Sequence, residues 1–316
     1  MKKRILSVLI LNVLLASSLL FISPLWAGEN LTLMLDWFPN VDHLPVYVAQ
    51  ELGYFADNQI EVDIVSPSET SDALKLAASG NMDIAVSYQP QTIIAADQGL
   101  DIKAIAPLVV HPLTTLLFLD TKNIQTPADL SGKKIGYTVP GLMDVLLEAF
   151  AAINQIQDYT PVNVGFTILP ALVSNQVDAV MGPFKTYETV GMAQHGYKAR
   201  FFELEKYGIP DYEELIFVCG PKALKEKGSA VHGFVTAVEK AQVYTKAHPE
   251  KALALYLAAL PQADKKIETQ AFELTRPYFA STLTHDPVKW QAFADFALEH
   301  GLIKDRVVAK DLIHTW

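Results

Sequence analysis

After its first 27 residues, the chain alternates short apolar runs with amphipathic segments. Residues 31–35, 60–65 and 84–88 have the length and the apolar pattern of strands. Residues 45–52 and the stretch "SETSDALKLAASG" space their apolar residues as helices do, and the second of these begins with an N-cap pattern. Strands that alternate with helices predict an α/β fold.

The same plan occurs twice along the chain. "AASGNMDIAV" near residue 80 and "LVSNQVDAVM" near residue 176 each read as a helix, a small polar turn, an aspartate and an apolar strand. Beyond Pro221 the pattern changes, and residues 229–247, 249–260, 265–279 and 287–300 have helical periodicity. We therefore expect two similar α/β units followed by a helical region.

Two further strands, "TTLLFLD" and "EELIFVCG", fall where the chain would pass from one unit to the other. They divide the chain into a first lobe of residues 28–117 plus 217–316 and a second lobe of residues 118–216. Two such crossovers make a hinge, and a ligand would lie between the lobes at the carboxyl ends of the strands. The predicted architecture is an α/β binding fold with two lobes joined by a two-crossover hinge.

Residues 1–27 have the pattern of a secretory signal. Lys2, Lys3 and Arg4 precede a long apolar run, and a cleavage site is expected before Gly28. An uncleaved membrane anchor is the alternative, since the run is about 18 residues long. With cleavage, the mature chain would be a free protein of the periplasm.

Composition and charge narrow the classes of partner. The formal net charge is −10, which argues against nucleic acid and anionic lipid as partners. Cys219 is the single cysteine, so neither an intrachain disulfide nor a cysteine-based metal site can form. The histidines have no metal-ligand spacing, and none accompanies a nucleophile motif. We expect a monomer that uses no metal and no cofactor.

The opening "LDWFPNVDHLPVYVAQELGYF" resembles the start of proteins that bind thiamine pyrimidine precursors for ABC importers. It also resembles the hydroxymethylpyrimidine synthases of the same fold. The similarity continues in "SGNMDIAVSYQPQTIIAADQGLDIKAIAPLV", in "LSGKKIGYTVPG" and in "KYGIPDYEELIFV", and so covers nearly the whole mature chain. The resemblance implies a periplasmic-binding-protein fold of type II, a small heteroaromatic ligand and an ABC permease as partner.

Polar and aromatic side chains crowd into the loop that follows the first strand. Asp36, Trp37, Asn40 and His43 lie within eight residues. An aminopyrimidine has a flat face on which Trp37 can stack and a polar edge that a carboxylate or an amide can bind. The alternative is that Asp36 and Asn40 cap the next helix while Trp37 belongs to the core. The resemblance favours ligand binding for Trp37 and Asn40.

Other candidates follow later strands. Tyr88 and Gln89 end the strand "DIAVSY", where they would supply an opposite aromatic face and a polar edge, unless they form an ordinary strand-to-helix connection. Tyr137 begins "YTVPG", a turn whose backbone N–H groups could hold an anionic or carbonyl group at a helix N-terminus.

The segment "GPFKTYETV" in the second lobe mirrors Tyr88 in the first. Phe184, Tyr187 and Glu188 follow a strand end there, and Glu188 is the expected partner of an exocyclic amine. The alternative for Glu188 is a solvent-facing residue that stabilises a helix dipole. Tyr212 lies near the second crossover, so it belongs to the hinge, the pocket or both.

Three functions remain open. The first is an extracytoplasmic binding protein that closes on a thiamine pyrimidine precursor and delivers it to a permease without making or breaking a bond. The second is a pyrimidine synthase that uses a lysine-bound pyridoxal phosphate, which the secretory leader disfavours. The third is a binding protein for another solute such as riboflavin or a sulfonate, and the scarcity of arginine in the candidate segments disfavours a sulfonate.

Overall fold

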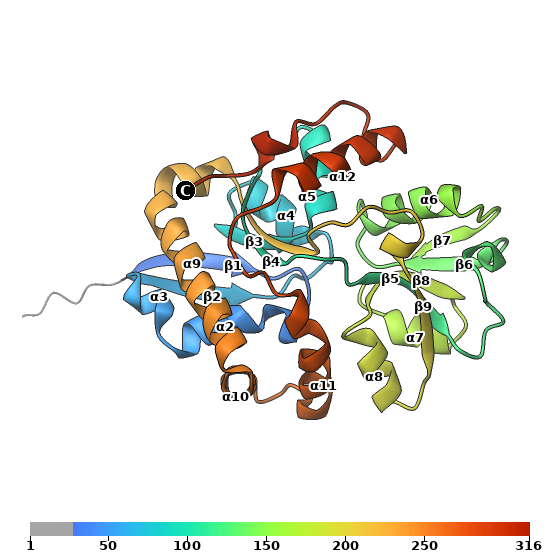
Figure 1. The fold of residues 1–316 in the computed structure, drawn as a ribbon, viewed down its shortest axis with the longest axis horizontal. Helices are drawn as coiled ribbons and strands as arrows, with labels where there is room; N and C mark the ends of the chain where they lie inside the picture. The colour runs from blue at the N-terminus through green and yellow to red at the C-terminus, as the bar shows by residue number, and fades with distance from the viewer. Residues whose placement is uncertain (1–27) are drawn as a thin grey trace, which may run out of the picture.

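The computed structural model of the protein describes residues 28–316. Its strands form two mixed sheets of five strands each, and each sheet forms one lobe with its helices (Figure 1). The first sheet contains β1 (Glu29–Met34), β2 (Ile60–Val65), β3 (Ile84–Ser87), β4 (Lys103–Val109) and β10 (Leu215–Cys219). The second contains β5 (Thr114–Leu119), β6 (Lys134–Tyr137), β7 (Thr160–Asn163), β8 (Ala179–Phe184) and β9 (Ala199–Glu203).

The two sheets share one topology. Their strand orders are β2-β1-β3-β10-β4 and β7-β6-β8-β5-β9. In each sheet the first three strands are parallel, and the fourth runs antiparallel to both of its neighbours. Each antiparallel strand directly follows a crossover from the other lobe. The predicted two-lobed α/β architecture is therefore confirmed.

Helices cover the faces of both sheets (Figure 1). The first lobe has η1 (Val41–His43), α2 (Leu44–Glu51), α3 (Tyr54–Asp57), α4 (Asp72–Ala78), α5 (Gln89–Asp97), α9 (Pro221–Ala247), α10 (Pro249–Ala259), α11 (Lys265–Thr275), η4 (Arg276–Tyr278), α12 (Pro287–Glu299) and η5 (Ala309–Leu312). The second has η2 (Pro127–Leu130), α6 (Met143–Ile153), α7 (Ile168–Val173), α8 (Glu188–Gln194) and η3 (Leu204–Lys206).

Two helix boundaries differ from the sequence-based expectation. The helix expected over residues 265–279 ends at Thr275 and continues as η4, where Pro277 has no N–H to donate to an α-helix. The helix expected from residue 229 already begins at Pro221 and includes a non-helical backbone at Lys227. Periodicity located the apolar faces, but it did not locate these ends.

The repeated phrase has the same conformation in both lobes. Gly80 and Asn175 follow the ends of α4 and α7 with left-handed backbones, at φ 73° and 57°. Asp83 and Asp178 come three residues later, and each carboxylate accepts a hydrogen bond from a backbone N–H of the neighbouring strand. The turn residues and the aspartate therefore fix the same helix-to-strand connection twice.

The chain crosses between the lobes through residues 110–113 and residues 207–214. Strand β5 lies wholly in the second sheet, between β8 and β9, which corrects the expected boundary at residue 117. The apolar pattern of "TTLLFL" suits either sheet, so it did not reveal which sheet the strand joins.

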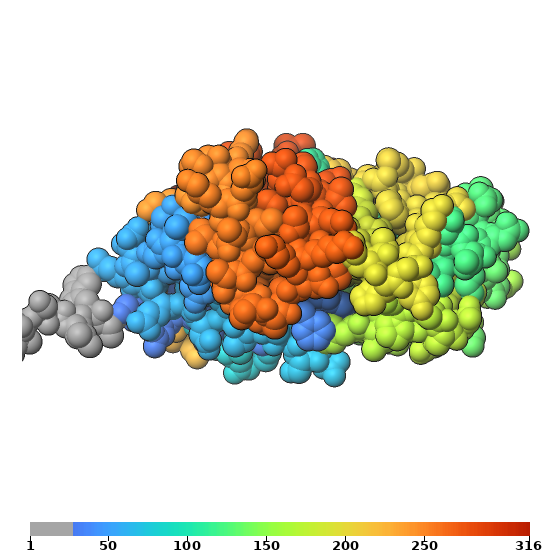
Figure 2. Space-filling model, turned by 90° about the horizontal axis from the view of Figure 1, so that it is seen from below, coloured from blue at the N-terminus to red at the C-terminus, as the bar shows by residue number. Residues whose placement is uncertain are grey.

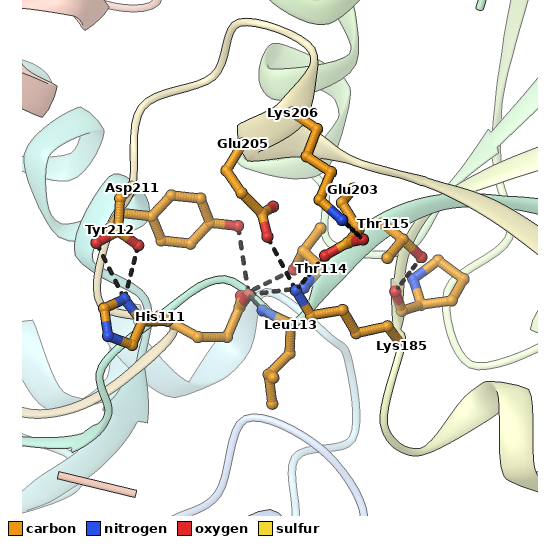
Figure 3. A network of polar contacts seen from close by, with 12 residues as sticks. His111, Leu113, Thr114, Thr115, Lys185, Glu203, Glu205, Lys206, Asp211 and Tyr212 are labelled. Atoms are coloured by element: carbon orange, nitrogen blue, oxygen red, sulfur yellow. Dashed lines mark hydrogen bonds and ion pairs between the residues drawn. The ribbon is translucent and has the colours of Figure 1, made fainter. Parts of the chain in front are cut away.

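A buried carboxylate joins the two crossovers. Glu214 Oε2 accepts hydrogen bonds from the backbone N–H groups of Leu113 and Thr114, and its Oε1 accepts one from the Thr114 hydroxyl, at 2.5, 2.7 and 2.8 Å. His111 and Asp211 meet beside it at 3.0 Å across the same two segments (Figure 3). Burial raises the pKa of Glu214 to about 7. These contacts fix the crossovers relative to each other.

Within residues 28–316, no helix is both long and apolar enough to cross a bilayer. The secretory signal predicted at residues 1–27 lies outside the described residues.

Candidate functional site

A cavity lies between the lobes at the carboxyl ends of their parallel strands. The free space among its walls is about 370 Å³ including the open mouth, of which about 20 Å³ admits the centre of a water molecule. The first lobe and the hinge contribute Asp36, Trp37, Asn40, Asp42, His43, Tyr88 and Leu215, and the second lobe contributes Thr138, Ile168, Gly182, Phe184, Tyr187 and Glu188. The cavity is therefore narrow and depends on both lobes.

Asp36 organises the wall that the first lobe contributes. Its Oδ1 is 2.8 Å from His43 Nε2, and its Oδ2 accepts a 2.7 Å hydrogen bond from the Tyr88 hydroxyl. All three side chains are almost completely buried. Burial next to this carboxylate raises the pKa of Tyr88 well above its ordinary value, so the phenol stays protonated. Asp36 thus holds a phenol and an imidazole in place at the cavity wall.

Asn40 both caps the next turn and lines the cavity. Its side-chain oxygen accepts a 2.9 Å hydrogen bond from the backbone N–H of Asp42. The backbone N–H of Asn40 points at His43 Nδ1 at 3.4 Å, which makes Nδ1 an acceptor and Nε2 the protonated donor to Asp36. Because the cap uses the oxygen of Asn40, its amide NH₂ group remains for a ligand.

Two carboxyl groups face the cavity from opposite lobes. Asp42 is fully buried; its Oδ1 accepts a hydrogen bond from Thr275 at 2.9 Å, and its Oδ2 has no partner. Glu188 begins α8, and its Oε2 accepts a 2.7 Å hydrogen bond from the backbone N–H of Phe184. Burial raises the pKa of each carboxyl to about 7. A ligand that donates hydrogen bonds would satisfy these groups.

Two side chains that line the cavity, Trp37 and Tyr187, also make contacts between the lobes. The Trp37 ring lies 4.6 Å from the Phe166 ring of the second lobe, measured between centroids. Tyr187 crosses in the opposite direction and donates a 2.7 Å hydrogen bond to Glu268 on α11. Helices α8 and α11 are in contact, and the view from below shows the two lobes touching along this side (Figure 2).

Three predicted site residues lie elsewhere. Gln89 is fully buried, and its side-chain oxygen accepts a hydrogen bond from the backbone N–H of Glu213 in the second crossover. Tyr212 is buried against Phe293 in the hinge. Tyr137, at the end of β6, is half-buried and is not among the residues lining the cavity. Gln89 and Tyr212 therefore have structural contacts at the hinge in this structure.

The structure brings the other eight predicted residues together. Asp36, Trp37, Asn40, His43, Tyr88, Phe184, Tyr187 and Glu188 all line the cavity. Sequence reasoning missed Asp42, although it lies inside the quoted motif between Asn40 and His43. It also missed Gly182, which has φ +126°, and whose close approach to Thr138 no local pattern indicates.

The charged groups that line the cavity are mainly acidic. Of the described residues that line it, three are carboxylic acids and none is a lysine or an arginine. His43 is the one basic side chain among them, and it is already bonded to Asp36. Across residues 28–316, no group of three or more His, Cys, Asp or Glu side chains is arranged to hold a metal ion. The site favours a neutral or cationic molecule that is rich in hydrogen-bond donors.

Two similar lobes, a two-crossover hinge and a cavity at the strand ends define the type II periplasmic-binding-protein fold. The alkanesulfonate-binding protein of Xanthomonas axonopodis pv. citri, solved with MOPS bound, shares this fold with a TM-score of 0.72. The match covers 91% of this chain and 98% of that chain at 16% identity.

The chain belongs to the NMT1/THI5-like family, whose model matches residues 40–252. A Haemophilus influenzae protein named for thiamine biosynthesis is 35% identical, over 91% of this chain and 92% of its own length. The formylaminopyrimidine-binding protein of Halalkalibacterium halodurans is 30% identical, over 90% and 89% respectively. A 4-amino-5-hydroxymethyl-2-methylpyrimidine phosphate synthase of Legionella pneumophila is 26% identical, over 83% and 84%.

Proposed function

We propose that this protein is the extracytoplasmic substrate-binding protein of an ABC importer. It captures a thiamine pyrimidine precursor of the hydroxymethylpyrimidine or formylaminopyrimidine type between its lobes. The observation that carries the proposal is the interlobe cavity, which has carboxylic acids and aromatic rings in its walls and no lysine or arginine among its described lining residues. The relative named as a formylaminopyrimidine-binding protein supports the same ligand class.

The chemistry of the walls matches an aminopyrimidine. Glu188 and Asp42 can accept hydrogen bonds from the exocyclic amine, and the free NH₂ group of Asn40 can donate to a ring nitrogen. Trp37 offers a face for stacking. A phosphate ester would bring negative charge to these carboxylates without a cation to neutralise it. The proposed ligand is therefore the free pyrimidine and not its phosphate.

The narrowness of the cavity fits capture by closure. The centre of a water molecule can reach only about 20 Å³ of the cavity, which is too little space for a pyrimidine ring. The lobes must therefore part for a ligand to enter. The closed arrangement would then differ in shape from the open one, and a permease can recognise that difference. We propose that the protein acts as a periplasmic monomer, exported by the leader at residues 1–27.

The alternatives fit the cavity less well. A pyrimidine synthase with lysine-bound pyridoxal phosphate needs a lysine in the cavity, and none lines it among the described residues, although relatives carry the synthase name. A sulfonate would need cationic partners. Capture without chemistry is the function that we propose.

A thermal-shift panel on the purified protein tests the ligand class. Hydroxymethylpyrimidine and its formylamino relatives should raise the melting temperature, with about 3 kcal/mol of stabilisation at a hundredfold excess over the dissociation constant. The phosphate ester of hydroxymethylpyrimidine should give no shift. Riboflavin and cytosine are comparison compounds, and native mass spectrometry gives the stoichiometry. The proposal would be contradicted if the phosphate ester raised the melting temperature and the uncharged pyrimidines did not.

Two substitutions test the site. Glu188→Gln and Trp37→Ala should each weaken pyrimidine binding at least tenfold, measured by calorimetry, because they remove a carboxyl acceptor and a stacking surface. The amide oxygen that Glu188→Gln introduces could still accept from the Phe184 N–H group, so the fold should persist. Glu148→Gln makes the same chemical change at an exposed position of α6 in the same lobe and is the matched control. Unchanged affinity in both site variants would refute the site assignment.

A further inference from the structure

A second compartment adjoins the narrow cavity, and we call it the vestibule. About 200 Å³ of it admits the centre of a water molecule, roughly ten times the value for the cavity. The two compartments share Trp37, Ile168, Tyr187 and Glu188 as walls. The vestibule therefore adjoins the proposed binding site across these shared side chains.

The walls that belong to the vestibule alone are mainly apolar and come from both lobes. Phe166, Leu169, Pro170 and Met192 lie in the second lobe, and Ile267 on α11 lies in the first. Met192 is buried, whereas Phe166, Leu169 and Ile267 are half-buried and so present apolar surface to the vestibule. A group that filled this space would remove apolar surface from water on both sides of the interlobe gap.

Few charged groups face the vestibule. Glu188 lies at the wall shared with the narrow cavity, and exposed His195 bonds the backbone oxygen of Gly191 through Nδ1 at 2.8 Å. None of the described lining residues is a lysine or an arginine. An anionic substituent would therefore lack a partner, whereas an uncharged apolar ring would meet Trp37 and Phe166.

We propose that the protein captures aminopyrimidines carrying an uncharged, ring-sized apolar substituent, with the pyrimidine in the narrow cavity and the substituent in the vestibule. This inference rests on the proposed function and extends its ligand class beyond the hydroxymethyl compound. Because the substituent would contact Ile267 in one lobe and Met192 in the other, it would also favour closure.

Gly191 provides a sharp test of the vestibule. It lines the vestibule from within α8, and a Cβ atom placed there would have no heavy atom within 4 Å. Its backbone is not left-handed, so a larger residue causes no backbone strain. A phenylalanine at this position would occupy space in the vestibule, whereas an alanine would leave most of it open.

The experiment compares two probes by calorimetry: 4-amino-5-hydroxymethyl-2-methylpyrimidine and the analogue with a 5-benzyl group. The native protein should bind the benzyl analogue about tenfold more tightly, since its ring removes further apolar area from water. Gly191→Phe should abolish that gain and leave affinity for the hydroxymethyl compound within about twofold of native. Gly191→Ala should retain both affinities. If Gly191→Phe does not fold, Ile267→Ala in the other lobe replaces it as the test, and it should reduce the affinity gain of the benzyl analogue.

The outcomes separate this inference from the proposed function. Equal affinity of the native protein for the two probes would overturn the vestibule assignment and leave pyrimidine capture intact. An equal loss of both affinities in folded Gly191→Phe would also overturn it, because the vestibule would then not act on the substituent alone. If neither probe binds the native protein, the proposed function fails and this inference fails with it.

Discussion

Asp42 and Asp36 show how two carboxyl groups in one loop acquire different roles. Asp36 uses both oxygens, one beside His43 and one as acceptor from Tyr88, so it serves to orient other side chains. Asp42 has one bonded oxygen and one buried oxygen without a partner. Such a group is costly in the empty protein and available to a ligand. The sequence showed two acids close together, and only their partners distinguish them.

At the residue scale, the stability of the protein should depend on Asp42 and pH. Burial raises the pKa of Asp42 from 3.8 to about 7, so the folded protein holds a proton that the unfolded chain releases between these values. The contribution of the protonated carboxyl to the free energy of unfolding is therefore fully present below pH about 4, and it is lost as the pH rises towards 7. The side chain that Asp42→Asn introduces cannot ionise, so the variant does not lose this stability. Between pH 4 and pH 8, its free energy of unfolding should therefore rise by roughly 4 kcal/mol relative to that of the native protein.

Urea unfolding of the native protein and Asp42→Asn at pH 4, 6 and 8 measures this difference. Asp311→Asn, an exposed acid in η5, is the matched control and should show no such trend. A constant difference between Asp42→Asn and the native protein across the three pH values would contradict the assignment of a buried, protonated carboxyl.

At the element scale, the ends of the parallel strands determine where the site forms. The segments after β1 and β3 carry Asp36 and Tyr88, and those after β6 and β8 carry Thr138 and Glu188. Gly182 lies within β8 beside Thr138, so the strand end forms a wall of the cavity without a side chain in the way. The repeated strand order of the two sheets makes these four ends face one gap.

Two glycines of the second lobe should respond oppositely to alanine. Gly182 has φ +126°, and a Cβ there would lie 2.0 Å from the Thr138 hydroxyl oxygen, so Gly182→Ala should destabilise the protein by about 2 kcal/mol or more. Gly191 lies in α8 with open space around it, so Gly191→Ala should stabilise by about 0.5–1 kcal/mol. Chemical denaturation measures both, and a stable Gly182→Ala would show that the strand end can move away from Thr138.

At the scale of the whole molecule, the lobes are held by their crossovers and by a few contacts across the gap. Glu214 joins the two crossovers at the hinge through its hydrogen bonds to Thr114. Away from the crossovers, two hydrogen bonds join the lobes across the gap. The Thr70 hydroxyl donates one of 2.7 Å to the backbone oxygen of Thr138, and Tyr187 donates one to Glu268. Contacts made only in the closed arrangement contribute to ligand affinity even where they do not touch the ligand.

Thr70→Val should therefore weaken pyrimidine binding about fivefold, since one net hydrogen bond contributes about 1 kcal/mol. Thr70 does not line the cavity, so the loss would act through closure. Thr236→Val is the matched control, because its hydroxyl bonds the His232 backbone oxygen within α9. Calorimetry gives the affinities, and X-ray scattering should show a larger radius of gyration for Thr70→Val with ligand at subsaturating concentration. Equal affinities in the two variants would exclude a role for this contact in closure.

The sequence by itself determined the alternation of strands and helices, the repeated helix-turn-aspartate-strand unit and the two-lobed α/β architecture, because these depend on local apolar spacing and turn residues. It also located the strand-end loops, so eight of the candidate residues line the cavity. Tertiary structure alone decided that β5 belongs to the second sheet and that Gln89 and Tyr212 are buried at the hinge. It alone decided that Asp42 and Gly182 reach the cavity, because the residues that they contact, Thr275 and Thr138 respectively, are distant from them along the chain.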